Sequence, residues 1–503
     1  MTTKPTHWAT LICMLATAAI LGCTSVFQVR GVEEPIKDDI ILDLIETEDP
    51  SSAAAHRIKA VEARSVEPLK LCVSGAKRKL VGEVCKPEPE PFKMGILEVD
   101  KHGSLNPKQR RQVFDMLDKE ARAARRSGSN LVIVLFIHGW HHGAGVCDYN
   151  LACLRRLVGG MANVYGSENR PDKRPPSRFV GLYFAWRGES IDKEGFNALT
   201  IYNRKRKAEK IGRSGATNLL LDIDEEYRRL KSLAQRKDRS VLMITAGHSL
   251  GGGMLLSALR QKLEGTVDEE TYIRSSHATG EPPPGKRPRV TGFGDLSILL
   301  NPAIQASRFQ AFADDLTAVI KDGNLAYDEE QTPVLLVVTS EADPATRKAF
   351  PLSRWLLPNN WFRGAAYRKA LGHYDRYRTH ELSSTLDVDH FFTSADREFA
   401  CGCPLYVVGD GLAELPHPKA GASFGGRLET ALPYAGGRAR SKAGAEPRYE
   451  LKRVFESGWD ENAPFWVVRV DETVINSHND IYNEALLRFV VVFLNTLFEK
   501  KGF

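Results

Sequence analysis

The sequence carries no strong excess of either charge. Across 503 residues, 69 Lys and Arg stand against 63 Asp and Glu, which gives a net charge of +6. So mild an excess on a long chain does not indicate a nucleic-acid partner, which requires a concentrated basic surface. The basic run from Asn203 to Lys210 is interpreted as a solvated helix face, with contact to an anionic membrane as the alternative.

The N-terminal apolar run is too short for a comfortable membrane span. It extends from Ala9 to Leu21, about 13 residues, where a spanning helix needs roughly 20. That is the length of a secretory signal's apolar region. The residues that follow, Ile20-Leu21-Gly22-Cys23, resemble a bacterial lipobox. The resemblance implies a signal peptide over 1–22 and lipidation of Cys23, and Thr24 in place of Asp implies sorting to the outer membrane. An uncleaved anchor, or an ordinary signal with a chance cysteine, are the alternatives.

The remaining cysteines lack the two-residue spacing that is typical of zinc sites. Without Cys13 and Cys23, six remain, an even number that favours disulfides in an exported chain. Short loops predict the pairs Cys72–Cys85 and Cys147–Cys153, whereas Cys401 and Cys403 are too close for a relaxed bridge. Neither a metal site nor a cofactor is expected.

The order of apolar segments predicts the fold class. Residues 23–91 are polar and are interpreted as a tether with a small N-terminal segment, and residues 92–503 as one domain. Apolar strands alternate there with helical stretches, which favours an α/β fold with a doubly wound, mainly parallel sheet. The expected strands are 94–100, 131–140, 178–186, 240–246, 294–302, 332–340 and 464–470, and the main expected helices are 106–126, 217–235 and 482–497. A segment of about 347–460, too long for a simple connection, precedes the last strand. Its Trp, Tyr and Phe content indicates a packed insertion, such as a lid.

The segment Ile244–Leu255, ITAGHSLGGGML, places Ser249 between Gly247 and Gly251. A buried strand precedes this Gly-x-Ser-x-Gly motif and a helical pattern follows it. The arrangement resembles the nucleophile elbow of the α/β-hydrolase superfamily, in particular its lipases and esterases. The resemblance implies a serine nucleophile at the carboxyl end of the sheet. The alternative is a serine that serves packing only.

The resemblance also implies where the partners of Ser249 lie, in the chain order Ser, acid, His. Asp343 follows the strand 332–340 directly, with Glu341 as the second candidate, whereas Asp295 precedes its strand and falls at the wrong end. His478 is the histidine that follows the last strand. Three further histidines compete from within the insertion and are interpreted as backbone-binding or pocket-lining residues: His373, His380 and His390.

Two backbone N–H groups are expected to form an oxyanion hole. One belongs to Leu250, the residue after the nucleophile, and the other to Trp140 in His138-Gly139-Trp140, which resembles the His-Gly-x motif of esterases. His141 and His142 are interpreted as supports of this loop or as part of the pocket rim.

Together these features predict a serine carboxylic-ester hydrolase, anchored by lipid in a bacterial envelope, with a small-molecule or lipid ester as substrate. Two alternatives remain open. The same fold and triad could act on thioesters or amides or transfer acyl groups, or the chain could be a non-catalytic lipoprotein that binds envelope partners.

Overall fold

The computed structural model describes residues 92–501 with gaps, the longer of which are 167–174, 187–207, 236–239, 264–289, 315–326, 356–363, 387–422, 433–447 and 455–458. The predicted signal peptide, the tether, Cys23 and the predicted pair Cys72–Cys85 lie outside the described residues, as do Cys401 and Cys403.

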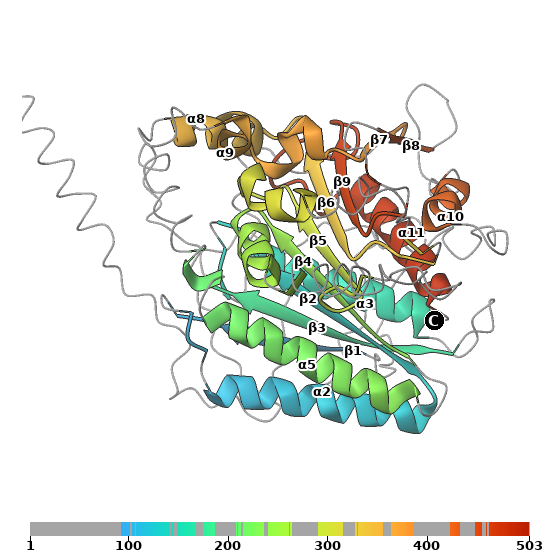
Figure 1. Cartoon of the computed structure of the whole chain (residues 1–503). Helices are drawn as coiled ribbons and strands as arrows, with labels where there is room; N and C mark the ends of the chain where they lie inside the picture. The colour runs from blue at the N-terminus through green and yellow to red at the C-terminus, as the bar shows by residue number, and fades with distance from the viewer. Residues whose placement is uncertain are drawn as a thin grey trace, which may run out of the picture.

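The described chain is built on a nine-stranded sheet with the order β1-β3-β2-β4-β5-β6-β9-β7-β8 (Figure 1). Every neighbouring pair is parallel except β7 and β8, which are antiparallel. The strands are β1 (Phe92–Glu98), β2 (Asn130–Ile137), β3 (Ser177–Ala185), β4 (Val241–His248), β5 (Leu296–Leu300), β6 (Leu335–Ser340), β7 (His380–Ser384), β8 (Tyr449–Arg453) and β9 (Phe465–Val470). The predicted α/β class with a mainly parallel sheet is confirmed.

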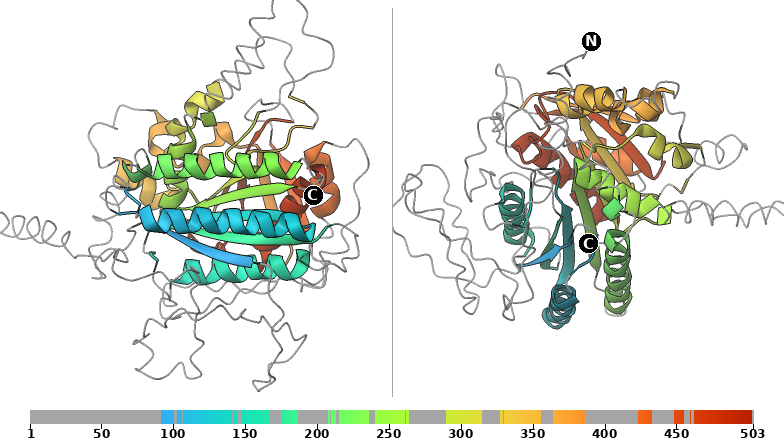
Figure 2. Two further views of the ribbon diagram at one scale, coloured as in Figure 1. Left: turned by 90° about the horizontal axis from the view of Figure 1, so that it is seen from below. Right: turned by 90° about the vertical axis from the view of Figure 1, so that its left-hand side faces the viewer.

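Helices cover both faces of this sheet, as Figure 2 shows from two directions. The longer ones are α2 (Pro107–Ser127), α3 (Tyr149–Tyr165), α5 (Gly215–Gln235) and α11 (Glu484–Lys500), and residues 250–260 are also helical. Strand β2 is buried along its whole length, so its alternating side chains enter two separate cores. Val132, Val134 and Phe136 pack with α3 and α11 on one face. Leu131, Ile133 and Leu135 pack with α2, α5 and 250–260 on the other.

The insertion contributes strands to the sheet. In its described parts, β7 pairs with β9 and β8 pairs with β7, so the insertion extends the sheet at the edge beyond the last predicted strand. It also includes the short helices α8 (Phe350–Trp355), α9 (Ala365–Arg368) and α10 (Phe424–Ala431). The sequence pattern did not predict β7 or β8, because both are short and partly polar. These parts of the insertion are part of the domain's framework, which differs from the expected lid.

The strand directions determine where functional side chains can meet. Five neighbouring parallel strands, β2, β4, β5, β6 and β9, end at the same edge of the sheet. Residues that follow these strands therefore lie close together although they are far apart in the sequence, as expected for open α/β sheets. Within the described part of the chain, no helix is long and apolar enough to cross a membrane.

Candidate active site

Ser249 occupies a strained turn between β4 and the helix of residues 250–260. Its φ is 54°, in the left-handed region that a residue with a Cβ rarely adopts. Its N–H donates to the carbonyl of Leu300 at 3.0 Å, and its carbonyl accepts from the N–H of Gly253 at 3.1 Å. These bonds on both sides hold the turn in place, and they tie it to the end of β5.

The two motif glycines permit this turn because other backbone segments come too close for a side chain. A Cβ on Gly251 would lie 2.4 Å from the carbonyl oxygens of Ile137 and His138, at the end of β2. A Cβ on Gly247 would lie 2.9 Å from the carbonyl oxygen of Gly251. The glycine spacing therefore brings the first helical turn against both strands and leaves the serine at its apex.

Ser249, His478 and Asp343 form one hydrogen-bonded chain. His478 Nε2 lies 2.7 Å from Ser249 Oγ, and His478 Nδ1 lies 2.8 Å from Asp343 Oδ2. A carboxylate only accepts, so Nδ1 carries the proton, and neutral Nε2 accepts from the serine hydroxyl. The predicted contact of Asp343 with His478 is thus present, at the distances expected of a nucleophile with its base.

Asp343 is fully buried and remains ionised. Burial alone would raise its pKa, but the electrostatic attraction of the neighbouring His478 ring and hydrogen bonds from His478, Thr346 and the Ala345 N–H lower the pKa to about 2. A carboxylate in this state can orient His478 and stabilise it when it becomes an imidazolium.

The backbone of His478 is fixed as well as its ring. Its carbonyl oxygen accepts from His248 Nε2 at 2.9 Å and from Asn301 Nδ2 at 3.0 Å. His248 is buried, and burial together with the nearby His478 holds its pKa well below the usual value, so it donates as a neutral ring. The loop that carries His478 is therefore anchored to the nucleophile strand and to the end of β5.

The loop after β2 lies directly beside the nucleophile. A Cβ on Gly139 would be 3.0 Å from Ser249 Cβ and 3.0 Å from His248 Nδ1. His138 accepts at Nε2 from the Trp186 N–H, so its Nδ1 donates to the carbonyl of Gly139, at 2.8 Å. Burial lowers the pKa of His138 to about 4, which keeps this ring neutral near pH 7.

Asp148 fixes the far end of the same loop. It caps α3 by accepting from the Leu151 N–H, and it also accepts from the Gly143 N–H at 3.0 Å and from His142 Nδ1 at 3.2 Å. Burial opposes its ionisation, but the bond and charge of His142 lower the pKa of Asp148 to about 2. His142 therefore supports the loop, as predicted. His141 lies outside the described residues.

The other candidates of the sequence lie elsewhere. Asp295, at the opposite end of β5, accepts from the Met243 N–H and from Tyr227 and Lys231. The Glu341 side chain is half exposed and lies 3.9 Å from Arg469. His380 stacks on Trp466 with ring centroids 4.0 Å apart. His390 lies outside the described residues, whereas His373 stands behind Asp343, as described below.

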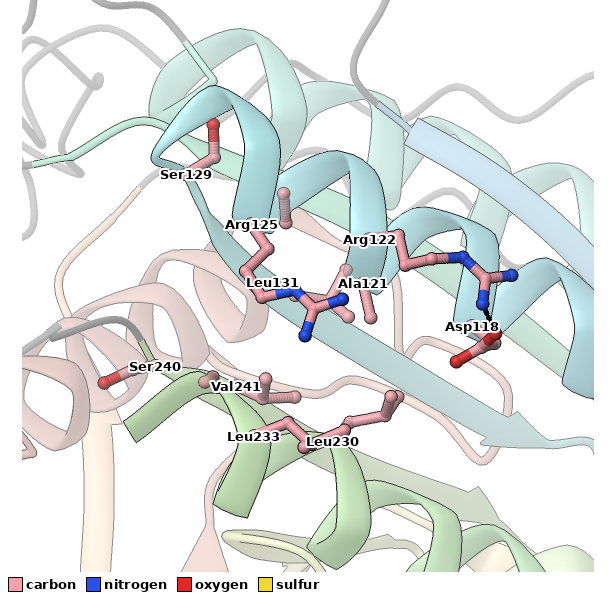
Figure 3. A pocket seen from close by; sticks show the side chains of 12 residues that line it. Asp118, Ala121, Arg122, Arg125, Ser129, Leu131, Leu230, Leu233, Ser240 and Val241 are labelled. Atoms are coloured by element: carbon pink, nitrogen blue, oxygen red, sulfur yellow. Dashed lines mark ion pairs between the residues drawn. The ribbon is translucent and has the colours of Figure 1, made fainter. Parts of the chain in front are cut away.

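A small pocket lies away from this site, between α2 and α5 (Figure 3). Its volume is about 30 Å³, and its lining includes Ser129 and Leu131 at the start of β2 and Ser240 and Val241 at the start of β4. Ser249 follows the other end of β4, so the pocket is at the opposite edge of the sheet. A cavity of this size accommodates little more than a water molecule and is no candidate for a substrate site.

Sequence reasoning missed Asn301, Thr346, and the part played by His248. Asn301 directly follows a buried strand, the same signal that identified Asp343, whereas Thr346 and His373 carry no local signal that distinguishes them.

Cys153 forms a disulfide, and its predicted partner Cys147 lies outside the described residues. Among the described residues, no cluster of His, Cys, Asp or Glu is arranged to hold a metal ion.

The fold and the triad define an α/β protein with a serine–histidine–aspartate constellation at the carboxyl edge of its sheet. Comparison with protein-family models, with curated proteins and with solved structures finds no match for this chain.

Proposed function

We propose that this protein is a serine carboxylic-ester hydrolase with an α/β-hydrolase fold. The observation that carries the proposal is the continuous chain from Asp343 through His478 to Ser249, with a strained serine between strand and helix. Three residues from three loops meet in the geometry that nucleophilic catalysis requires. A serine that served packing alone would not need a buried ion behind its histidine partner.

The proposed mechanism uses these three residues in turn. Ser249 Oγ attacks the ester carbonyl carbon while His478 Nε2 takes the hydroxyl proton. Asp343 holds the Nδ1 proton and stabilises the imidazolium. The proton on Nε2 then passes to the departing alkoxide, which leaves as the alcohol. Water, deprotonated by His478, hydrolyses the acyl-enzyme and restores the serine.

The N–H groups of Leu250 and Trp140 are proposed to bind the oxyanion. Leu250 is the first residue of its helix, where N–H groups lack intrahelical acceptors. His138 holds the Gly139 carbonyl, and the peptide bond to Trp140 is trans, so the Trp140 N–H points away from His138. Each such donor contributes roughly 3 kcal/mol to stabilising the transition state.

Cys23 is proposed to anchor the enzyme by lipid to the bacterial envelope, with a small-molecule or lipid ester as substrate. The support is the lipobox-like Ile20-Leu21-Gly22-Cys23 after a short apolar run. The His478 side chain is 21% exposed, so the triad is open to solvent from its histidine side.

A panel of p-nitrophenyl esters of graded chain length, with a thioester and an anilide, tests the proposed activity. We expect the wild-type protein to hydrolyse at least one ester class faster than the thioester and the anilide, and Ser249→Ala to hydrolyse none. Turnover of no ester, or equal turnover by the alanine variant, would exclude the proposal.

A further inference from the structure

The carboxylate of Asp343 accepts four hydrogen bonds. Oδ1 accepts from the N–H groups of Ala345 at 2.8 Å and Thr346 at 3.3 Å. Oδ2 accepts from His478 Nδ1 at 2.8 Å and from the hydroxyl of Thr346 at 2.5 Å. The oxygen that orients the catalytic histidine is therefore shared with a threonine side chain.

The direction of the next hydrogen bond follows from the first. Asp343 is ionised and only accepts, so the single hydroxyl proton of Thr346 points at its carboxylate. Thr346 Oγ1 also lies 3.0 Å from His373 Nε2. With its proton already committed, the hydroxyl accepts here, and His373 must carry a proton on Nε2. The result is a directed chain from His373 through Thr346 to Asp343.

His373 is held rigidly behind the acid. It ends the short 3₁₀ turn η5 (Leu371–His373), whose Leu371 N–H donates to the carbonyl of Ile304 at 2.9 Å. Gly372 packs so closely on Thr339 that a Cβ there would overlap its side chain. Arg469 of β9 donates from Nε and a terminal nitrogen to the Gly372 carbonyl, at 3.2 and 3.1 Å. The turn is thus fixed to β6, to β9 and to the segment that follows β5.

His373 acts as a neutral donor. Burial lowers its pKa to about 4, and the charges of Arg469, Arg347 and Lys369 act in the same direction, while Asp343 opposes them. At neutral pH the ring therefore donates a hydrogen bond to the Thr346 hydroxyl and places no second cation near Asp343. A competing cation would weaken the attraction between Asp343 and the imidazolium of His478 during catalysis.

We propose that Thr346 and His373 are positioning residues of the triad, which together aim Oδ2 of Asp343 at His478. The inference rests on the proposed hydrolase function and deepens it. Neither residue forms a hydrogen bond with Ser249, and both act through Asp343. Their effect is on the orientation of the carboxylate, since a hydrogen bond polarised by a second one behind it binds its acceptor more strongly.

Two matched pairs of variants test this. Thr346→Val keeps the shape of the side chain and removes the hydroxyl, whereas Thr346→Ser keeps the hydroxyl. His373→Leu removes the donor, whereas His373→Gln can present an amide N–H near the position of Nε2. Each variant is assayed for kcat and KM on the best ester of the wild-type protein, and for its thermal midpoint.

We expect Thr346→Val to lower kcat about tenfold or more with KM nearly unchanged, because the lost bond is made to a charged group. Thr346→Ser should retain most of the wild-type kcat. His373→Leu should likewise have a lower kcat than His373→Gln, by a smaller factor than that between the two Thr346 variants. If Thr346→Val fails to fold, the His373 pair decides the question alone.

Folded Thr346→Val and His373→Leu variants with kcat within twofold of wild type would overturn the positioning role while leaving the hydrolase proposal intact. Equal losses in both members of each pair, with KM rising together with the fall in kcat, would also overturn it. A wild-type protein without ester turnover would instead remove the proposed function, and this inference with it.

Discussion

Asn301 donates from its side-chain amide to the carbonyl oxygen of His478 across 3.0 Å. Its amide oxygen accepts from the Ser340 N–H at 2.9 Å, so the orientation of the amide is determined by its two partners. Asn301 is fully buried and has a φ of 43°, a conformation that Asn tolerates better than most residues. One side chain thus joins the ends of β5 and β6 to the loop of the catalytic histidine.

Asn301→Asp should therefore weaken both the site and the fold. A carboxylate cannot donate to the His478 carbonyl, and it places a buried charge against that oxygen. We expect kcat to fall more than tenfold and the unfolding free energy to fall by about 2 kcal/mol or more. Steady-state kinetics and urea denaturation measure the two effects. Wild-type values of both would show that the bond does not hold the loop.

Substitution of Ser249 should separate catalysis from stability. Ser249→Ala is expected to keep less than about a thousandth of wild-type turnover, with stability unchanged or slightly higher. Ser249→Gly should be more stable than Ser249→Ala, because glycine adopts a φ near 54° without the cost of about 1 kcal/mol that a Cβ brings. Thermal midpoints of the two variants provide the comparison, and a less stable glycine variant would contradict the assigned strain.

The choice between the two neighbouring acids can be made with one pair of variants. Asp343→Asn should lower turnover about 10⁴-fold, since an amide neither fixes the histidine tautomer nor stabilises its imidazolium. Glu341→Gln is the matched control and should retain turnover, because the Glu341 side chain is half exposed and pairs with Arg469 at 3.9 Å. The reverse result in the ester assay would transfer the acid role to Glu341.

Buried neutral histidines should make the fold sensitive to acid. Burial lowers the pKa values of His138 and His373 to about 4 and of His380 to about 3. Between about pH 6.5 and pH 4 the unfolded chain binds protons that the folded chain excludes, so stability decreases as the pH falls. Each group contributes a slope of about 1.4 kcal/mol per pH unit in that window.

His380→Phe tests this linkage with little change in packing, because a phenyl ring can still stack on Trp466. Urea denaturation at pH 7, 6 and 5 gives the unfolding free energy of both proteins. As the pH falls, this free energy should decrease less steeply in the variant than in the wild-type protein, by about 1.4 kcal/mol per pH unit. Parallel curves for the two proteins would refute the assignment of His380 as a buried neutral ring.

Lipidation of Cys23 is a separate prediction. Mass spectrometry of membrane fractions from a bacterial host should find a mature chain that begins at Cys23 and carries a diacylglyceryl group. Cys23→Ser should leave the protein unlipidated. A wild-type chain with an unmodified mature N-terminus at another residue would refute the lipobox interpretation.

The sequence predicted seven of the nine strands, β1 to β6 and β9, and the residues of the triad, because these depend on local signals. Strands such as β2 and β4 are continuous apolar runs, and Ser249, Asp343 and His478 each follow the end of such a run. Parallel pairing then places their residues at one edge. The superfamily resemblance supplied the order of roles.

The remaining features depend on long-range packing. Strand β7 contains His380, Glu381 and two serines, and it is held in the sheet by pairing with β9 on one side and β8 on the other. Thr346 and His373 meet 27 residues apart, through a turn whose position is set by β6 and β9. No periodicity or motif encodes such contacts, so they emerge only from the folded structure.

The central claim is that Ser249 is a nucleophile activated by His478. Incubation with a fluorophosphonate probe, followed by peptide mass spectrometry, tests it most directly, because such probes phosphonylate activated serines. We predict one equivalent of probe on the peptide that contains Ser249, with labelling abolished in Ser249→Ala and strongly slowed in His478→Ala. A folded wild-type protein that stays unlabelled, or that is labelled at another serine, would contradict the account.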